Sequence, residues 1–327
     1  HAPIEGRLSA GVELTGELSA DSPTAYYVFD EVGSEALGVI LNTEGFPPGA
    51  QVFSAGSSSV VDIYPGFGQQ LGSVTLLAEG SEPSILRVDR VSPFADDFAG
   101  LTDGEGVPPF EGPFDLSIVG VETLHRDDDP VQGKGVGLYR VDLPTLSGSA
   151  MSGKPELQVV ATSSSEGSID FSLLDGAGYQ YSSESSSSTI TYPIPSGIAS
   201  ELFVGVRSDA FEIEVRGPDE IPISESRLEQ SVMAAGLFAV DLPEGAFRTV
   251  TVLPQSGPSD WRVSVYRDPL LQPILQDVFQ ADYVTTLGCE GTGVYTIELR
   301  GASFGIGGGP AGAAAADLVV GPGVADD

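Results

Sequence analysis

One seven-residue pattern occurs three times in this chain of 327 residues, and it constrains the fold more than any other feature. It reads aromatic, polar, aliphatic, polar, aliphatic, variable, glycine, and it occupies residues 114–120, 211–217 and 295–301. Apolar residues at every second position predict a strand with one buried face, and the glycine ends that strand. The chain is therefore expected to contain three copies of one β unit.

Other strand patterns recur in the same order in each copy. An opening strand that ends in aspartate is predicted at 27–30, 139–142 and 238–241, and the latter two continue as Asp-Leu-Pro, where proline blocks further pairing. Between the opening and closing strands, further strands are predicted at residues 74–77, 157–160, 169–173, 189–192, 250–253 and 261–266.

A third recurring segment precedes the closing strand, at 85–88, 202–206 and 283–287. Turn-forming residues such as those at 207–210 follow it, which predicts a hairpin into the closing aromatic residue. No window keeps a helical spacing over three turns. Residues 269–279 come closest, and they are expected to form either a short helix after Pro273 or a loop that packs Leu270 and Leu271.

These patterns predict an all-β chain of three tandem, antiparallel β-sandwich domains of the jelly-roll or immunoglobulin-like kind. The domain boundaries are expected near Val121 and Pro218, and the short junctions predict a fairly rigid rod. The predicted parts are residues 1–121 with an insertion at 93–113, residues 122–217, residues 218–301, and a Gly/Ala-rich tail at 302–327.

The second copy, with Tyr-Arg-Val-Asp-Leu-Pro at 139–144, Glu-Leu-Phe-Val-Gly-Val at 201–206 and Phe-Glu-Ile-Glu-Val at 211–215, resembles the bacterial pre-peptidase C-terminal domain. The third copy resembles it less closely, and the insertion stretches the first. The resemblance covers nearly all of residues 16–301. It implies a small β-sandwich with an accessory, adhesive or structural role outside the cell and no catalytic residues. Unlike the family's usual setting, no peptidase domain accompanies the copies.

Charge excludes several classes of partner. There are 47 Asp and Glu residues against 14 Lys and Arg, a formal net charge of −33. Nucleic-acid binding needs clustered cations, and an anionic membrane surface would repel this chain. No apolar run is long enough for direct membrane insertion. The first residues, His-Ala-Pro, are typical of a terminus left by signal-peptide cleavage, and an acidic surface suits saline surroundings. We therefore expect a secreted protein at the cell surface.

Two kinds of metal site can be formulated from the sequence. Asp96, Asp97, Asp103 and Glu105 form an acidic loop with the hard oxygen ligands that calcium requires, and residues 127–129 form a second acidic run. The alternative is a solvated run of charges. The amine and imidazole of His1 are a candidate copper chelate, against the alternative of an ordinary first residue.

Catalytic motifs are missing from the sequence. It contains no serine nucleophile elbow, zinc-binding His-Glu-x-x-His, Walker loop or dinucleotide fingerprint, and His125 is the only histidine besides His1. Trp261 is expected in the core, and Cys289 is expected to be a passive thiol. The chain is therefore expected not to be an enzyme and to need no cofactor other than the candidate calcium.

The tail carries a short apolar strand after its glycine-rich hinge. Leu318, Val319 and Val320 are expected to add a strand either to another subunit or to the chain's own last domain. The function that the sequence favours is a secreted structural protein that forms a filament or surface layer with copies of itself or with other surface proteins. The alternative is a cell-surface adhesion module that binds carbohydrate or protein, assisted by calcium.

Overall fold

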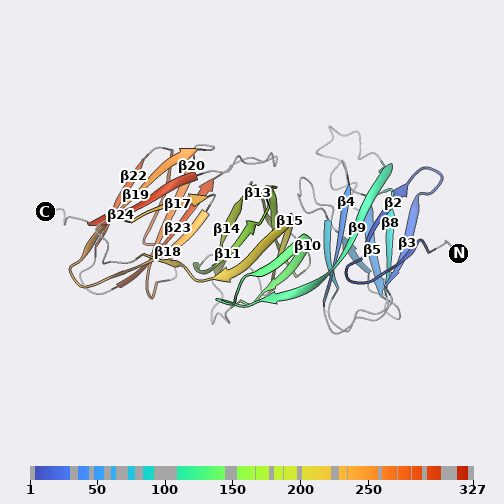
Figure 1. The fold of residues 1–327 in the computed structure, drawn as a ribbon, viewed down its shortest axis with the longest axis horizontal. Helices are drawn as coiled ribbons and strands as arrows, with labels where there is room; N and C mark the ends of the chain where they lie inside the picture. Colours follow the sequence, from blue (N-terminus) through green and yellow to red (C-terminus); the bar gives the residue numbers. More distant parts are fainter. Residues whose placement is uncertain are drawn as a thin grey trace.

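The structure is a computed structural model that describes residues 4–29, 36–43, 48–54, 60–63, 73–77, 84–91, 109–143, 153–165, 167–176, 180–186, 188–196, 201–221, 228–233, 235–256, 260–270, 272–280, 282–288, 293–302 and 315–322. All the regular secondary structure in these ranges is β-strand, which confirms the all-β class. Three units lie in a row along the long axis, with the two termini at opposite ends (Figure 1).

The first unit is a sandwich of two sheets. Sheet A has the order β1 (Gly6–Leu8), β3 (Thr24–Phe29), β8 (Ser84–Asp89), β5 (Gly49–Ser54) and β6 (Val60–Ile63). Sheet B consists of β2 (Glu13–Leu18), β9 (Gly112–Leu124), β4 (Leu37–Thr43) and β7 (Ser73–Leu77). Their facing side chains form one buried core, to which Tyr27 and Leu86 contribute from sheet A and Val39 and Phe114 from sheet B.

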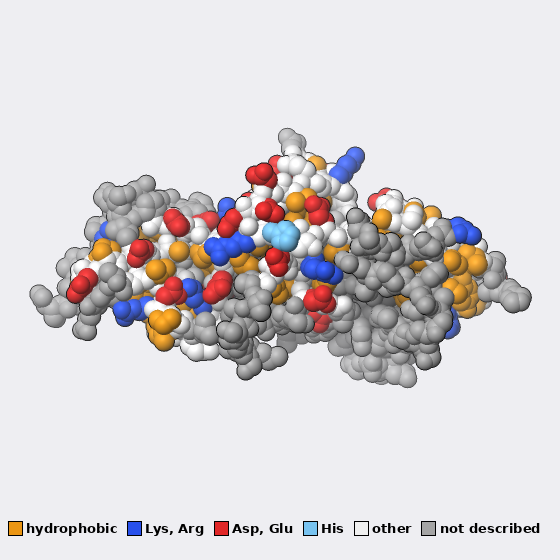
Figure 2. Space-filling view, turned by 90° about the horizontal axis from the view of Figure 1, so that it is seen from below, with side chains coloured by type: hydrophobic (Ala, Val, Ile, Leu, Met, Phe, Trp, Pro, Cys, Tyr) orange, Lys and Arg blue, Asp and Glu red, His pale blue; other side chains and the backbone are white. Residues whose placement is uncertain are grey.

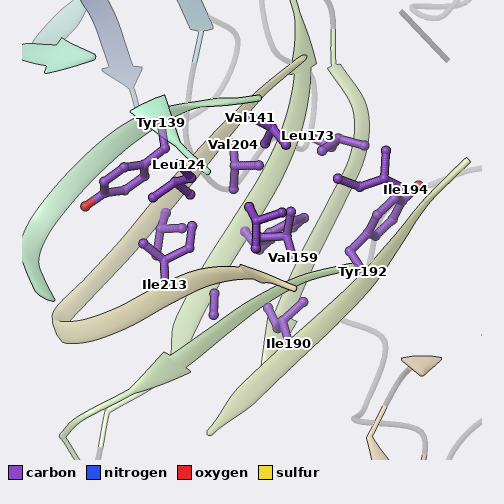
Figure 3. Packing of buried hydrophobic residues seen from close by; sticks show 14 of the residues in the cluster. Leu124, Tyr139, Val141, Val159, Leu173, Ile190, Tyr192, Ile194, Val204 and Ile213 are labelled. Carbon is purple, nitrogen blue, oxygen red and sulfur yellow. The ribbon is translucent and has the colours of Figure 1, made fainter. Parts of the chain in front are cut away.

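The second unit is built around one long strand, β15 (Leu202–Arg216). The first part of β15 pairs with β12 and its last part with β11, so this strand runs through both layers of the sandwich. The buried side chains meet between these layers (Figure 3). The other strands are β10 (Val131–Val141), β11 (Gly153–Ser163), β12 (Ile169–Asp175), β13 (Gln180–Ser186) and β14 (Thr189–Ser196).

The third unit is again a sandwich. Sheet D has the order β16 (Asp219–Glu220), β18 (Ala235–Leu242), β23 (Gly293–Ala302), β20 (Asp260–Arg267) and β21 (Leu275–Phe279). Sheet E has the order β17 (Leu228–Met233), β24 (Ala315–Pro322), β19 (Phe247–Ser256) and β22 (Tyr283–Gly288). Trp261 is 1% exposed in the core between the sheets, as the sequence predicts.

Strand pairing is mostly antiparallel. Among the described strands, three pairs are parallel: β1 with β3, β9 with β10, and β16 with β18. The predicted boundary near Val121 falls inside β9, and the one near Pro218 falls between β15 and β16.

The three closing patterns all lie in strands with the predicted face buried. Their aromatic residues, Phe114, Phe211 and Tyr295, are at most 1% exposed, and the aliphatic residues two and four positions later are equally buried. In the first two units a tyrosine of the opening strand meets this ring edge-on, at 6.4 Å between the centroids of Tyr27 and Phe114 and 6.2 Å for Tyr139 and Phe211. Such pairs stabilise a core by about 0.5–1.5 kcal/mol beyond burial alone.

A glycine lies directly across the ladder from each of these two phenylalanines. Gly16 pairs with Phe114, and Gly133 pairs with Phe211. An added Cβ would lie only 2.2 Å from the ring carbon Cζ in both cases. The ring of each closing phenylalanine therefore packs directly on the backbone of the opposite glycine, where no side chain would fit.

Two local predictions are wrong. Residues 207–210 form no hairpin, because β15 continues through them and the buried hydroxyl of Ser208 contacts Ser163 and the carbonyl oxygen of Ala210. Residues 275–279 form neither helix nor loop but strand β21, which pairs with β20. The side chains of Leu275 and Phe279 pack against the core of the third unit. Leu270 is 51% exposed rather than packed, and Leu271 lies outside the described residues.

We predict that Gly133→Ala destabilises the protein by about 1–3 kcal/mol, because the ring of Phe211 must move to admit the methyl group. Gly321→Ala is the matched control, since a Cβ there meets nothing within 4 Å. Thermal unfolding measures both variants. An unfolding midpoint of Gly133→Ala equal to that of the control would contradict the close packing.

Candidate functional site

Several residues predicted as sites lie outside the described part of the chain. These are the candidate calcium ligands Asp96, Asp97, Asp103 and Glu105 and the candidate copper ligand His1. Cys289, which is expected to be a passive thiol, also lies outside the described part. Most of the predicted insertion at 93–113 also lies there. The two metal sites therefore stay predictions.

The second histidine and the second acidic run are in the described part. His125 lies between β9 and β10, and its Nδ1 is 2.9 Å from a carboxylate oxygen of Asp142 at the exposed surface. Asp127 accepts a hydrogen bond from Arg126 Nε at 3.0 Å and one from the amide of Gly217 at 3.4 Å. In the ranges that the structure describes, no three His, Cys, Asp or Glu side chains gather as a metal ion requires. Those ranges also hold no helix long and apolar enough to cross a membrane.

The apolar tail segment forms β24, and both edges of this strand pair within the same chain. Val320 lies opposite Leu228 of β17 on one side and Val250 of β19 on the other. Leu318 and Val320 are buried in the core of the third unit. Of the two alternatives for Leu318, Val319 and Val320, the structure has pairing with the chain's own last unit, so β24 itself has no free edge for another subunit.

The first and second units are joined by a shared sheet and an apolar cluster. Strands β9 and β10 pair in parallel where the units meet, which joins sheet B to the sheet of the second unit. On the outer face of sheet B, Ile40 is fully buried against side chains of the second unit, namely Leu138, Leu174 and Phe203. Gly38 lets Leu138 approach, because a Cβ at Gly38 would lie 2.3 Å from a methyl carbon of Leu138.

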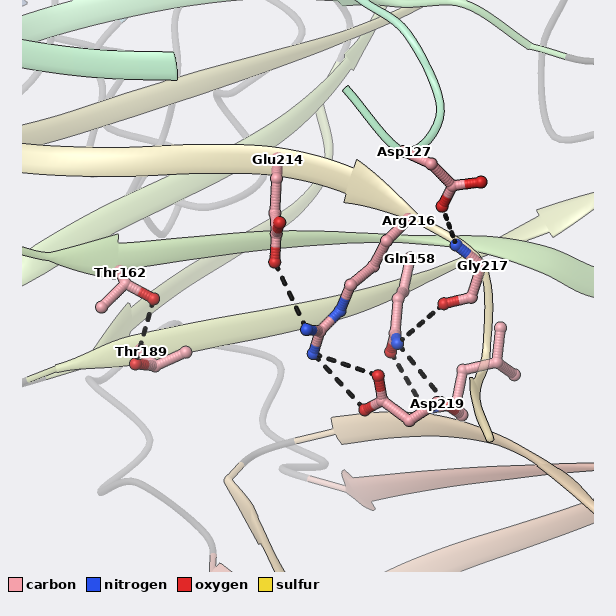
Figure 4. Close-up of polar contacts among 9 residues, drawn as sticks. Asp127, Gln158, Thr162, Thr189, Glu214, Arg216, Gly217 and Asp219 are labelled. Carbon is pink, nitrogen blue, oxygen red and sulfur yellow. Dashed lines mark hydrogen bonds and ion pairs between the residues drawn. The ribbon is translucent and has the colours of Figure 1, made fainter. Parts of the chain in front are cut away.

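The second and third units are joined by a buried glutamine. Gln158 of β11 is fully buried, and its amide nitrogen donates to the carbonyl oxygen of Gly217 at 3.1 Å (Figure 4). Its amide oxygen accepts a hydrogen bond from the backbone N–H of Leu237 in β18, also at 3.1 Å. A buried polar side chain with both ends satisfied fixes the two partners in one arrangement.

A partly buried arginine makes a second contact at this junction. Arg300 of β23 lies over the ring of Tyr192 in β14, 4.7 Å from its centroid, and donates to the carbonyl oxygen of Pro193. Glu298 accepts from Arg300 Nε and from the hydroxyl of Tyr266. Burial opposes the charge of Arg300, but Glu298 and Tyr192 outweigh it, so the pKa of Arg300 is raised. Lys154 and Asp268 add an ion pair between the same units.

The most exposed large apolar side chains of the described residues lie in the two outer units. Among the described residues, the large apolar side chains with the greatest exposure lie in the first and third units and none lies in the second: Ile4, Ile85, Val91, Leu270, Ile274, Val278, Val284 and Val294. Figure 2 shows a group of hydrophobic side chains at the right-hand end, on the first unit. Acidic side chains are spread over the middle of the same view.

Solved structures are similar to this chain at low sequence identity. No protein-family profile and no curated protein matches the sequence. The pre-peptidase C-terminal domain of a Bacillus anthracis collagenase is similar in structure, with 14% identity and a TM-score of 0.27 over 36% of this chain and 98% of that one. The Aeromonas hydrophila lysozyme inhibitor PliG reaches 13% identity and a TM-score of 0.23, over 32% of this chain and 94% of that one. Similarities of this size carry no information on activity.

The junction residues could not be recognised from the sequence. Gln158 stands in a strand pattern where a polar residue normally faces water, and Arg300 occupies the variable position of the closing pattern. A faint signal does exist for the first junction, because Gly38 and Ile40 lie together in a run that is apolar on both faces.

We predict that Gln158→Leu destabilises the contact between the second and third units. Leucine keeps much of the volume but leaves the N–H of Leu237 and the carbonyl of Gly217 buried without partners, a loss of about 1–3 kcal/mol. Differential scanning calorimetry should then resolve an earlier transition for the third unit. Gln132→Leu is the control, because Gln132 is exposed and bonds only to Glu212 among the contacts described. An unchanged calorimetric profile for Gln158→Leu would contradict the role of this residue.

We also predict that the protein loses stability between about pH 10 and pH 12. Burial, followed by the charge of Glu298, raises the pKa of Tyr266 to about 12, and burial with Glu122 raises the pKa of Tyr139 to about 12. Since an unfolded tyrosine ionises near pH 10, the folded state is favoured below that pH and the advantage is lost as the pH rises toward 12.

In Tyr266→Phe this loss should be shallower, because one of the raised groups is gone. Unfolding midpoints recorded across this pH range for both proteins test it, and Tyr139→Phe should behave in the same way. If the unfolding midpoint of both variants falls as steeply with pH as that of the unchanged protein, Tyr266 and Tyr139 are not the groups responsible for the loss of stability.

Proposed function

We propose that this protein is a secreted, non-enzymatic structural protein whose copies join end to end in an extracellular filament or surface layer. The observation that carries the proposal is the position of the exposed apolar side chains, which lie on the first and third units and not on the described part of the second. A single binding module would need one such surface. A subunit that is joined at both ends needs two surfaces on opposite ends.

The charge of the chain favours the same function. At a net charge of −33, two copies repel each other unless salt screens the charge or apolar contacts outweigh it. Contacts between copies should therefore use the patches where apolar residues replace charged ones. Two different patches on one molecule give head-to-tail contacts, which form an open chain when the rotation between copies does not close a ring.

The two junctions inside the chain suit a subunit that must keep its shape. One is a continuous sheet with an apolar cluster, and the other has buried hydrogen bonds at Gln158 and partly buried ones at Arg300. Contacts of this kind resist bending between units, whereas a flexible linker would let the relative orientation of the two end units vary.

We predict that purified protein associates more strongly as salt rises. At ~1 M salt the screening length falls to about 3 Å, so repulsion between acidic surfaces fades while apolar contacts persist. Sedimentation velocity across a salt series measures the effect. A protein that is monomeric at every salt and protein concentration, or assemblies that dissolve as salt rises, would contradict the proposed function.

A further inference from the structure

Each unit of this chain begins with a short strand that runs parallel to its opening strand. In the first unit this entry strand is β1, which pairs with β3, and in the third unit it is β16, which pairs with β18. In the second unit the entry strand is the end of β9, residues 121–124, which pairs with residues 138–141 of β10. All three parallel ladders among the described strands are of this kind, so the chain enters each unit in the same way.

The chain leaves the first and second units along their closing strands. Strand β9 runs directly from sheet B into the second unit, and β15 is followed by Gly217 and then by β16 of the third unit (Figure 1). A pull on the two ends of the chain therefore acts on each of these units at its entry strand and at its closing strand.

Just after the entry strand, one backbone N–H bonds to the closing strand in both of these units. Gly11 donates to the carbonyl oxygen of Ile118 at 2.7 Å, and Asp127 donates to that of Val215 at 2.8 Å. Ile118 and Val215 are equivalent, because each lies four residues after the phenylalanine of its closing pattern. Both donors have a left-handed backbone, with φ of 81° and 61°, and Asp127 is the only non-glycine residue of the described ranges with a positive φ. The same turn therefore joins entry to exit in both units.

In the second unit the carboxylate of Asp127 makes a further contact with the exit. One of its oxygens accepts a hydrogen bond from the backbone N–H of Gly217, the residue after β15, at 3.4 Å (Figure 4). The other accepts from Arg126 Nε at 3.0 Å, and Arg126 itself forms a parallel bridge with Val215. Residues 126–127 and 215–217, here called the entry–exit contact, therefore lie side by side and run in the same direction.

Parallel neighbours that are pulled from opposite ends are loaded in shear. A pull from the first unit draws residues 126–127 backward along the strand direction, whereas a pull from the third unit draws residues 215–217 forward. The hydrogen bonds between the two segments then share the load and must break together, whereas bonds that are pulled sideways break one at a time. Resistance to force depends on the rate of unfolding, so contacts between the two pulled segments matter more than contacts elsewhere.

We propose that the second unit bears tension along the chain and that the entry–exit contact carries the load across it. The proposal rests on the proposed structural role and deepens it, because a subunit joined at both ends is pulled from both ends. The side chain of Asp127 is 63% exposed, so its contacts contribute little to thermal stability. Their position between the two pulled segments gives them their effect.

Optical tweezers test the proposal on the full chain, with DNA handles ligated to its two termini. Residues 122–217 form the shortest unit once β24 is counted with the third, so the second unit is recognised by the smallest step in extension. Asp127→Gly removes the carboxylate but keeps the backbone N–H, and glycine suits the left-handed backbone. It should shorten the lifetime of the second unit under constant tension by about 2- to 10-fold, as the loss of one hydrogen bond implies.

Asp128→Gly is the matched control, because Asp128 is an exposed neighbour and its carboxylate takes part in no hydrogen bond or ion pair among the described residues. Its lifetime under tension should equal that of the unchanged protein. Asp127→Asn keeps an oxygen for the N–H of Gly217 and tolerates the left-handed backbone, so it should retain most of the resistance.

Unfolding in denaturant without tension completes the test. There, Asp127→Gly and Asp128→Gly should unfold at similar rates. Equal lifetimes of the two variants under tension would overturn the proposal. So would an acceleration of Asp127→Gly that is equally large in denaturant, because the contact would then stabilise the unit in every direction. Single molecules are measured here, so this proposal and the end-to-end assembly that sedimentation tests can each fail without the other.

Discussion

The arrangement of this chain follows from one constraint: each β-sheet has two faces, and the apolar side chains on either face must be buried or left exposed to water. The inner faces of each sandwich form the cores, around Phe114, Phe211 and Tyr295. The outer faces that point toward the second unit are covered at the junctions, by Ile40 and its cluster on one side and by Gln158 and Arg300 on the other. What remains uncovered lies at the outer units, and there the apolar residues are exposed.

Much of the fold could be predicted because strand periodicity is local. The alternation in the closing patterns marks the buried face of β9, β15 and β23 correctly, and it needs no knowledge of the partner strand. The all-β class follows from the same signal. Trp261 in the core was likewise predictable from its alternating neighbours.

The wrong predictions concern segments whose structure depends on the strands that they pair with. Residues 207–210 resemble a turn by composition, but Arg207 and Ser208 pair with β10 and the ladder resumes at Phe211, so β15 continues across a local irregularity. The tail could pair with any free edge as far as the sequence shows, and only the gap between β17 and β19 selects β24 as an internal strand. Gln158 and Arg300 act across a junction, so no pattern within their own strands reveals them.

The proposed function requires that copies of this protein meet end to end. Cryo-electron microscopy of material assembled at high salt tests this most directly, through the axial spacing between successive copies. End-to-end assembly predicts a spacing close to the length of one three-unit chain, with the first unit of each copy against the third unit of the next. Copies packed side by side, with a spacing much shorter than one chain, would contradict it.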